Sequence, residues 1–184
     1  WLVLNAANGA VGRLAVQFAK ARGINVLGLV RRAAGVQELA EQGINNVVST
    51  DAENWREQVA QILGDAVPLS GVDSVGGPAA GEVLSLLGEG GTLVSFGAMA
   101  SPTMEISSGD LIFKQATVKG FWGSKVMDAM DAPTKMRLIG EILQRVAAGE
   151  VTLPASETFT FDDAASAMGE NFRPGRVGKA LLRP

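Results

Sequence analysis

The sequence of 184 residues predicts an α/β fold in which a doubly wound, parallel sheet of six strands carries helices on both faces. Three observations predict it. Apolar runs of strand length alternate with amphipathic segments over residues 1–150, as in a parallel sheet that is covered on both faces. A glycine-rich turn follows the first apolar run. Glycine is also abundant: the chain has 23, where an average share of about 7% would give about 13, and most lie where a strand meets a helix.

The glycine-rich turn is the most informative feature. The apolar run 1–5 is expected to be a buried strand, and Ala6-x-x-Gly9-x-x-Gly12 joins it to a helix. A helix N-terminus offers free backbone N–H groups and the positive end of the helix dipole, which together bind phosphate. Gly9 lets the backbone approach a pyrophosphate, and Gly12 lets the helix pack closely on the strand. With a second strand at 24–30, this arrangement predicts a Rossmann-type dinucleotide-binding unit.

Two arginines follow the second strand and indicate which dinucleotide binds. Units that bind NAD usually place an acid there, whereas this chain has Arg31 and Arg32. A guanidinium suits the 2′-phosphate of NADP(H), because its planar fork of donors matches phosphate oxygens. A hydrogen bond to a charged group contributes roughly 1.5–3 kcal/mol, which predicts a preference for NADPH over NADH of about ten- to a hundredfold. The alternative is that both arginines simply face water.

The remaining elements are predicted from apolar spacing and from the glycine or proline at their ends. The first helix is expected to end at Gly23, and its inward face to consist of Val11, Leu14, Ala15, Phe18 and Ala19. Further helices are expected at 37–41, 55–63, 79–87 and 131–149. Further strands are expected at 46–50, 71–75, 91–96 and 116–121. Four loops then share the carboxyl edge of the sheet, where ligands bind in doubly wound folds; they follow Asn5, Val30, Val75 and Phe96.

The pattern changes near residue 150, which divides the chain into a dinucleotide-binding domain at 1–150 and a C-terminal segment at 151–184. The segment is expected to contain strands at 158–161 and 178–182 around a short helix at 162–168. Asp162 and Asp163 are interpreted as a helix cap and a first-turn acid. Because the chain starts at Trp1 directly on a strand, we expect a fragment of a longer protein, with 151–184 completing an absent N-terminal catalytic domain.

Composition excludes several function classes. The net charge of −3 and the lack of a basic stripe argue against nucleic acid, and the apolar runs are too short to span a membrane. Without His or Cys, no ordinary catalytic zinc site can form, so we expect no metal. The missing His and Tyr also remove the commonest proton donors, so no catalytic residue is expected within this chain. The N-terminus lacks a signal-peptide pattern, and a cytoplasmic location is expected.

Four motifs resemble the coenzyme-binding domain of the medium-chain dehydrogenase/reductase superfamily. They are Asn5-Ala-Ala-Asn-Gly-Ala-Val-Gly12, Val75-Gly76-Gly77, Phe96-Gly97-Ala98-Met99 and Gly178-Lys179-Ala-Leu-Leu182. Within that superfamily, Asn5–Asn8 and Gly120-Phe121-Trp122 are most similar to mitochondrial-type trans-2-enoyl thioester reductases, followed by quinone oxidoreductases. The resemblance implies an NADPH-dependent, two-domain reductase of an enoyl thioester or a quinone, in which a tyrosine of the N-terminal domain donates the proton.

Two other functions stay open. Zinc-dependent alcohol dehydrogenases belong to the same superfamily, so the chain is alternatively the cofactor domain of such an enzyme, with zinc held elsewhere in the parent. The other open function is that of a non-catalytic module that binds a dinucleotide or supports oligomerisation. The superfamily resemblance further implies a homodimer through the edge strand 116–122, because an unpaired hydrophobic edge tends to find a partner.

The resemblance also assigns cofactor-binding roles residue by residue. It implies that the pyrophosphate is bound by Asn8, Gly9, Ala10 and Val11, and the 2′-phosphate by Arg31 and Arg32. The adenosine and ribose would be bordered by Gly76 and Gly77, and the nicotinamide side by Phe96, Gly97 and Met99. The acyl pocket would be bordered by Phe121 and Trp122, and Lys179 would lie near the cofactor. Structural alternatives are a core position for Phe96, core or interface positions for Phe121 and Trp122, and a solvated charge for Lys179. Asn5 is expected to fix the turn and Asp73 to be structural.

Overall fold

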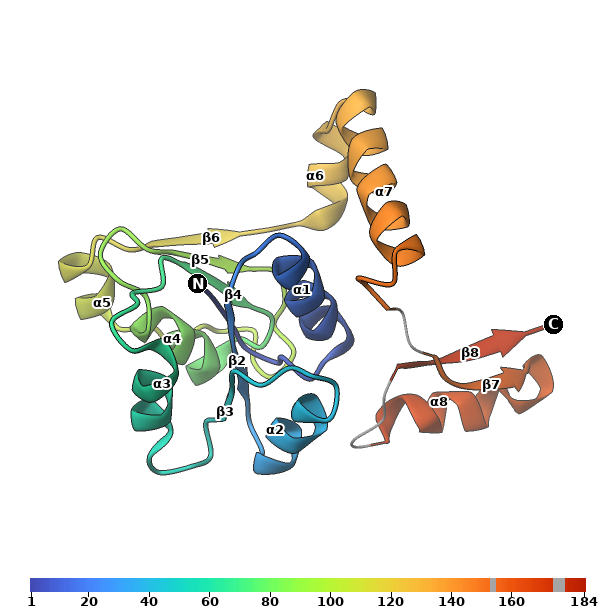
Figure 1. The fold of residues 1–184 in the computed structure, drawn as a ribbon, viewed down its shortest axis with the longest axis horizontal. Helices are drawn as coiled ribbons and strands as arrows, with labels where there is room; N and C mark the ends of the chain where they lie inside the picture. Colours follow the sequence, from blue (N-terminus) through green and yellow to red (C-terminus); the bar gives the residue numbers. More distant parts are fainter. Residues whose placement is uncertain (153–154, 174–177) are drawn as a thin grey trace.

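A computed structural model describes residues 1–152, 155–173 and 178–184. Six parallel strands form one sheet in the order β3-β2-β1-β4-β5-β6 (Figure 1). Their bounds are β1 (Leu2–Leu4), β2 (Val26–Val30), β3 (Val47–Ser49), β4 (Ser70–Asp73), β5 (Thr92–Ser95) and β6 (Thr117–Gly120). The strand order reverses at β1, which pairs with β2 on one side and β4 on the other. The predicted doubly wound sheet is therefore confirmed.

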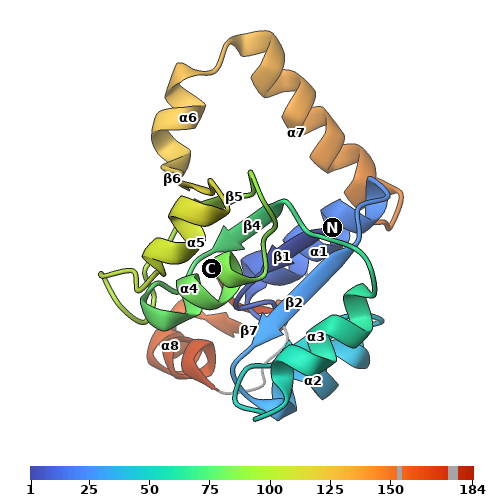
Figure 2. The same ribbon diagram turned by 90° about the vertical axis from the view of Figure 1, so that its left-hand side faces the viewer.

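Helices cover both faces of this sheet (Figures 1 and 2). On one face, α3 (Trp55–Leu63) and α4 (Gly77–Ser85) bury Trp55 and Val83 against strand residues such as Val3 and Leu93. On the other face, α1 (Ala10–Ala21) and α2 (Ala33–Ala40) bury apolar side chains against β2 and β3. The strands are apolar on both sides because both sides are covered.

The inward face of α1 differs from the prediction. The helix buries Val16 and Ala19, whereas Val11 is 57% exposed and Leu14 lies beside a cavity. The cause is Gly12, which packs against the turn that follows β1: a Cβ there would lie 2.4 Å from the Ala6 carbonyl oxygen. The close approach at Gly12 sets the rotation of the helix, so the apolar residue before it turns away from the core.

Two short helices, α5 (Ser108–Phe113) and α6 (Gly123–Ala129), were not predicted. The Ser107 hydroxyl caps α5 by accepting a hydrogen bond from the Asp110 N–H at 3.3 Å. The predicted helix after Asp131 is confirmed as α7 (Ala132–Ala147), in which the Asp131 carboxylate accepts from the Thr134 N–H at 2.7 Å. These caps satisfy N–H groups that the first helical turn leaves free.

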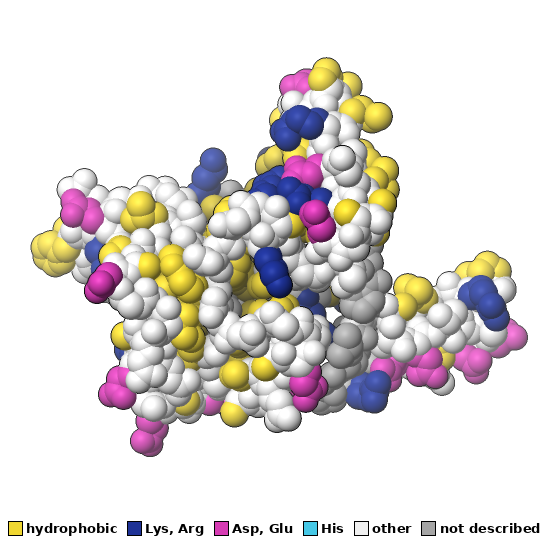
Figure 3. Space-filling view, in the orientation of Figure 1, with side chains coloured by type: hydrophobic (Ala, Val, Ile, Leu, Met, Phe, Trp, Pro, Cys, Tyr) yellow, Lys and Arg dark blue, Asp and Glu magenta, His cyan; other side chains and the backbone are white. Residues whose placement is uncertain are grey.

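Helices α6 and α7 form an arch that projects beyond the sheet (Figure 2). A cluster of ion pairs attaches α7 to the end of α1: Arg22 binds Glu141 through two bonds of 3.0 and 2.7 Å, and Arg145 donates to the Ala21 carbonyl at 3.0 Å. The outer side of α7 is apolar and open, since Met136 and Leu143 are both more than 60% exposed (Figure 3).

The C-terminal segment forms a separate β-α-β unit. Strands β7 (Ala155–Thr160) and β8 (Lys179–Arg183) pair in parallel, and α8 (Ala164–Phe172) connects them after a short 3₁₀ turn, η1 (Phe161–Asp163). The expected cap, Asp162, lies within η1, so that assignment is wrong. Asp163, expected in the first turn, stands instead at the N-cap of α8, where its carboxylate accepts from the Thr160 hydroxyl at 2.9 Å and caps no helical N–H group. Across the described residues, every helix is too short or too polar to cross a bilayer.

Candidate dinucleotide-binding site

The turn between β1 and α1 leaves the start of the helix open. Ala6 takes a positive φ of 48°, and the Gly9 N–H donates to the Ala6 carbonyl at 2.8 Å, which directs the chain into the helix. Gly9 is extended at the N-cap position. In the described part of the chain no side chain caps α1, and its first turn carries no acid. The free N–H groups and the helix dipole therefore favour an anion at this point.

A buried polar network fixes the strand ends beneath the turn. Asp73 at the end of β4 is fully buried, and its carboxylate accepts from the Asn5 amide at 2.6 Å, from the Ser95 hydroxyl at 2.8 Å and from the Val75 and Gly76 N–H groups. The Asn5 side-chain oxygen accepts from the Ser74 N–H at 3.0 Å. One carboxylate thus joins β1, β4 and β5 at the edge where their loops begin, as expected of a structural Asp73 and a turn-fixing Asn5.

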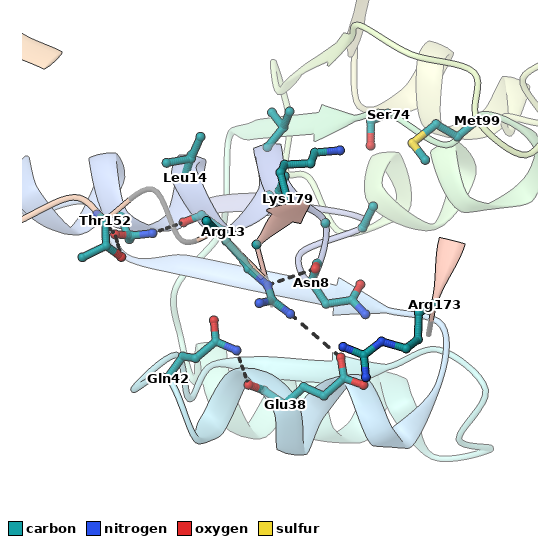
Figure 4. Close-up of a pocket in the computed structure, with 18 of the residues that line it drawn as sticks. Asn8, Arg13, Leu14, Glu38, Gln42, Ser74, Met99, Thr152, Arg173 and Lys179 are labelled. Carbon is teal, nitrogen blue, oxygen red and sulfur yellow. Dashed lines mark hydrogen bonds and ion pairs between the residues drawn. The ribbon is translucent and has the colours of Figure 1, made fainter. Parts of the chain in front are cut away.

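A cavity of about 730 Å³ opens at the start of α1 (Figure 4). The glycine turn forms one wall, α2 contributes Glu38, and the C-terminal segment contributes Arg173 and Lys179. Arg13 crosses this space: its Nε donates to the Asn8 carbonyl at 3.0 Å, and its guanidinium lies 4.0 Å from the Glu38 carboxylate. The buried Arg13 therefore connects the turn to α2.

The structure brings together about half of the predicted site residues. Those that line the cavity are Asn8, Gly9, Ala10, Val11, Phe96, Met99 and Lys179. Phe96 is 39% exposed and Met99 82% exposed, so neither is a core residue. The predicted residues outside the lining of this cavity are Arg31, Arg32, Gly76, Gly77, Gly97, Phe121 and Trp122.

Each of these outer residues has a definite setting. Arg31 and Arg32 are exposed where β2 passes into α2. Gly76 has a φ of 74°, and a Cβ there would lie 2.3 Å from the Ser101 carbonyl oxygen, so its loop must pack tightly. Phe121 and Trp122 are 46% and 64% exposed after β6, which rules out a core position for either within this chain.

Glycines 77 and 97 are likewise held by close packing. A Cβ at Gly77, which has a φ of 57°, would lie 3.3 Å from the Ser101 side chain, and the Gly77 N–H donates to the Thr103 carbonyl at 2.8 Å. A Cβ at Gly97 would lie 2.8 Å from the Ser74 carbonyl oxygen. Both glycines therefore bring loops together at the carboxyl edge of the sheet.

Three charged residues of the cavity were not anticipated from the sequence: Arg13, Glu38 and Arg173. Arg13 is a charged residue within the amphipathic pattern of α1, so the pattern alone would place it on the surface, whereas the structure buries it. Glu38 lies on α2 and Arg173 directly follows α8, and no local pattern reveals how these two helices are placed. Only the packing of α2 and α8 beside the turn brings these side chains together.

Solved structures that share this fold include oxidoreductases. A quinone oxidoreductase from Pseudomonas syringae pv. tomato DC3000 superposes with a TM-score of 0.80 at 23% identity, covering 100% of this chain and 56% of that chain. A mitochondrial 2-enoyl thioester reductase heterodimer from Candida tropicalis gives a TM-score of 0.78 at 20% identity, covering 92% and 51%. At this identity the likeness establishes the fold.

Relatives found by sequence are oxidoreductases as well. The human mitochondrial enoyl-[acyl-carrier-protein] reductase is 29% identical over 186 residues, covering 98% of this chain and 50% of the relative. The Arabidopsis thaliana protein of the same name is 38% identical over 126 residues, covering 66% and 33%. The chain thus spans about half the length of the human relative and a third of the length of the Arabidopsis thaliana relative. The family model described as "Zinc-binding dehydrogenase" matches residues 10–141. The chain therefore belongs to this family and is a coenzyme-binding domain of the medium-chain dehydrogenase/reductase superfamily.

Proposed function

We propose that the chain is the NADPH-binding half of an oxidoreductase that transfers hydride to an activated C=C bond of a 2-enoyl thioester or quinone-like substrate. The open N-terminus of α1 behind the glycine turn is the observation that carries the proposal. It offers N–H groups and a positive dipole to a pyrophosphate, and Gly12 lets it pack closely against the turn. NADPH supplies the hydride when bound, while the residues of this chain bind and orient it.

The proposed cofactor contacts follow the carboxyl edge of the sheet. Asn8, Gly9, Ala10 and Val11 receive the pyrophosphate. Arg31 and Arg32 receive the 2′-phosphate; both are exposed beside the turn and form no ion pair with any side chain that the structure describes. The adenosine and nicotinamide ends take the remaining contacts, from Gly76, Gly77, Phe96, Gly97, Met99, Phe121, Trp122 and Lys179.

The relatives support the reaction class. A related solved structure, 20% identical, is a complex with NADP and crotonyl-CoA, and the curated relatives are enoyl-[acyl-carrier-protein] reductases. This chain contains no tyrosine, so in the proposed enzyme the proton donor comes from outside it. We also propose that 151–184 packs on the catalytic domain of the parent. The half-exposed Leu181 and Leu182 of β8 favour this, because burial of apolar surface stabilises such a contact.

A homodimer through 116–122 is part of the proposal. Strand β6 is an edge of the six-stranded sheet, and an unpaired edge favours pairing with a second copy. A cytoplasmic location remains a prediction, while the curated relatives named above are mitochondrial. Microscopy of the tagged full-length protein tests it, and a mitochondrial signal would contradict it.

Zinc, which the family description names, does not fit this chain. Catalytic zinc needs several ligands from Cys, His or acidic side chains, and the sequence has neither Cys nor His. Over residues 1–152, 155–173 and 178–184, no three acidic side chains are grouped so that they could hold a metal ion. A zinc-dependent alcohol dehydrogenase would therefore require every ligand from the rest of the parent.

Calorimetric titration of this chain with NADPH and NADH, in parallel, tests the proposed function. We expect NADPH to bind about ten- to a hundredfold more tightly, and the double variant Arg31→Ala/Arg32→Ala to lose that preference. Arg137→Ala is the matched control, since it removes one exposed guanidinium from α7. Equal binding of both dinucleotides would refute the arginine assignment, and the absence of binding would refute the proposed function.

A further inference from the structure

The cavity beside the glycine turn is positively charged within an acidic chain. The chain has a net charge of −3, yet its cavity is lined by three cationic side chains, Arg13, Arg173 and Lys179, and by one carboxylate, Glu38. Two of the three cations come from the C-terminal segment, which lies far from the turn in sequence. A local excess of positive charge attracts anions even where the whole molecule is acidic.

Arg173 is the cation that the arguments above leave without a role. It follows α8, and its side chain is 63% exposed. Its Nε and one terminal nitrogen donate to a single carboxylate oxygen of Glu170, in the preceding helix, at 3.0 and 2.6 Å. In Figure 4 the guanidinium points into the cavity, toward the Glu38 carboxylate and on the same side as Asn8. Glu170 is only 11% exposed, whereas the Arg173 side chain stays 63% exposed, so a phosphate in the cavity can reach the guanidinium and compete with Glu170 for it.

We propose that Arg173 binds a phosphate group of the dinucleotide, so that the C-terminal segment contributes directly to the cofactor site. This inference rests on the proposed function and deepens it. The planar fork of Arg173 can donate two parallel hydrogen bonds to phosphate oxygens, and the cavity that it enters is the one at the open start of α1. The Glu38 carboxylate, which lies 4.0 Å from the guanidinium of the buried Arg13, balances part of the positive charge of the cavity.

The test compares two variants that change the charge at this point in opposite directions. Arg173→Ala in the complete chain removes the guanidinium and is expected to weaken NADPH binding about tenfold, more strongly at low salt. Glu170→Gln keeps the size of its side chain but removes the carboxylate that competes for Arg173, so it is expected to tighten binding. Arg137→Ala on α7 is the matched control for the loss of one exposed arginine, and it should leave the affinity unchanged.

Titrations with NADPH and NADH identify which phosphate is bound. A loss in Arg173→Ala that is equal for both dinucleotides supports contact with the pyrophosphate, and a loss confined to NADPH supports contact with the 2′-phosphate. If the unmodified chain binds NADPH but Arg173→Ala binds it equally well, the inference is overturned while the proposed function stands. If the unmodified chain binds neither dinucleotide, both are overturned. If Arg173 had only a structural role through its ion pair with Glu170, both variants would weaken NADPH binding. Tighter binding by Glu170→Gln would therefore argue against that role.

Discussion

Replacing Gly12 by alanine tests whether close packing of α1 against Ala6 and Ala7 holds the glycine turn in place. The added Cβ would lie 2.4 Å from the Ala6 carbonyl oxygen and 2.8 Å from both the Cα and the carbonyl oxygen of Ala7. All three are backbone atoms, so no side-chain rotation can relieve the contact. The helix must shift away from Ala6 and Ala7, or the turn must change shape.

The magnitude combines two opposing effects. Overpacking in a well-packed interior typically costs about 1–3 kcal/mol, and a contact with rigid backbone belongs at the upper end of that range. Alanine in a helix interior is favoured over glycine by about 1 kcal/mol, which offsets part of the cost. We therefore expect Gly12→Ala to lower the free energy of unfolding by about 2 kcal/mol. For a chain of this size, that corresponds to a fall in Tm of roughly 4–8 °C.

Gly140→Ala is the matched control. Gly140 lies within α7, and its Cβ would meet no heavy atom within 4 Å. The same substitution should therefore stabilise the protein by up to about 1 kcal/mol through helix propensity alone. Urea unfolding followed by circular dichroism measures both variants, and calorimetry with NADPH measures the effect on the turn. If Gly12→Ala proved as stable as Gly140→Ala, the argument from close packing would be refuted.

Three further predictions concern other parts of the fold. The hydrogen bonds from Arg22, and then from Arg145, lower the pKa of Glu141 to about 2, below its ordinary 4.5. The ionised Glu141 therefore stabilises the protein above pH 4.5, and this contribution is lost as the pH falls toward 2. In Glu141→Gln the melting temperature should depend less on pH between 4.5 and 2 than in the unmodified protein. The same dependence on pH in both proteins would contradict this. Asp73→Ala leaves four donors without their acceptor: the buried Asn5 amide and Gly76 N–H, and the partly buried Val75 N–H and Ser95 hydroxyl. It should cost about 3 kcal/mol or more in urea unfolding, and a loss below 1 kcal/mol would show that the network contributes little. Light scattering at tens of micromolar should give twice the chain mass of 19.1 kDa if β6 pairs with a second copy, and a monomer would remove that proposal.

Local sequence patterns predicted the elements that contain their own signals. The glycine turn, the helix capped by Asp131 and all six strands of the main sheet were predicted, because apolar spacing and end residues act within a few residues. Helix α5 has six residues and α6 has seven, too few for a helical period to become visible among irregular loops. Both were missed for that reason.

The fold class and the open helix start where we propose that a phosphate binds can both be predicted from the amino-acid sequence, because an apolar strand, a glycine turn and a helix start are adjacent in the chain. Which side chains meet at that helix start depends on tertiary packing. Gly12 turns Val11 out of the core, and α2 and the C-terminal segment bring Glu38 and Arg173 beside the turn. Backbone preferences and apolar periodicity act between residues that are close in sequence, so they can be recognised in the sequence. The charges that line a cavity depend instead on how elements distant in sequence pack together.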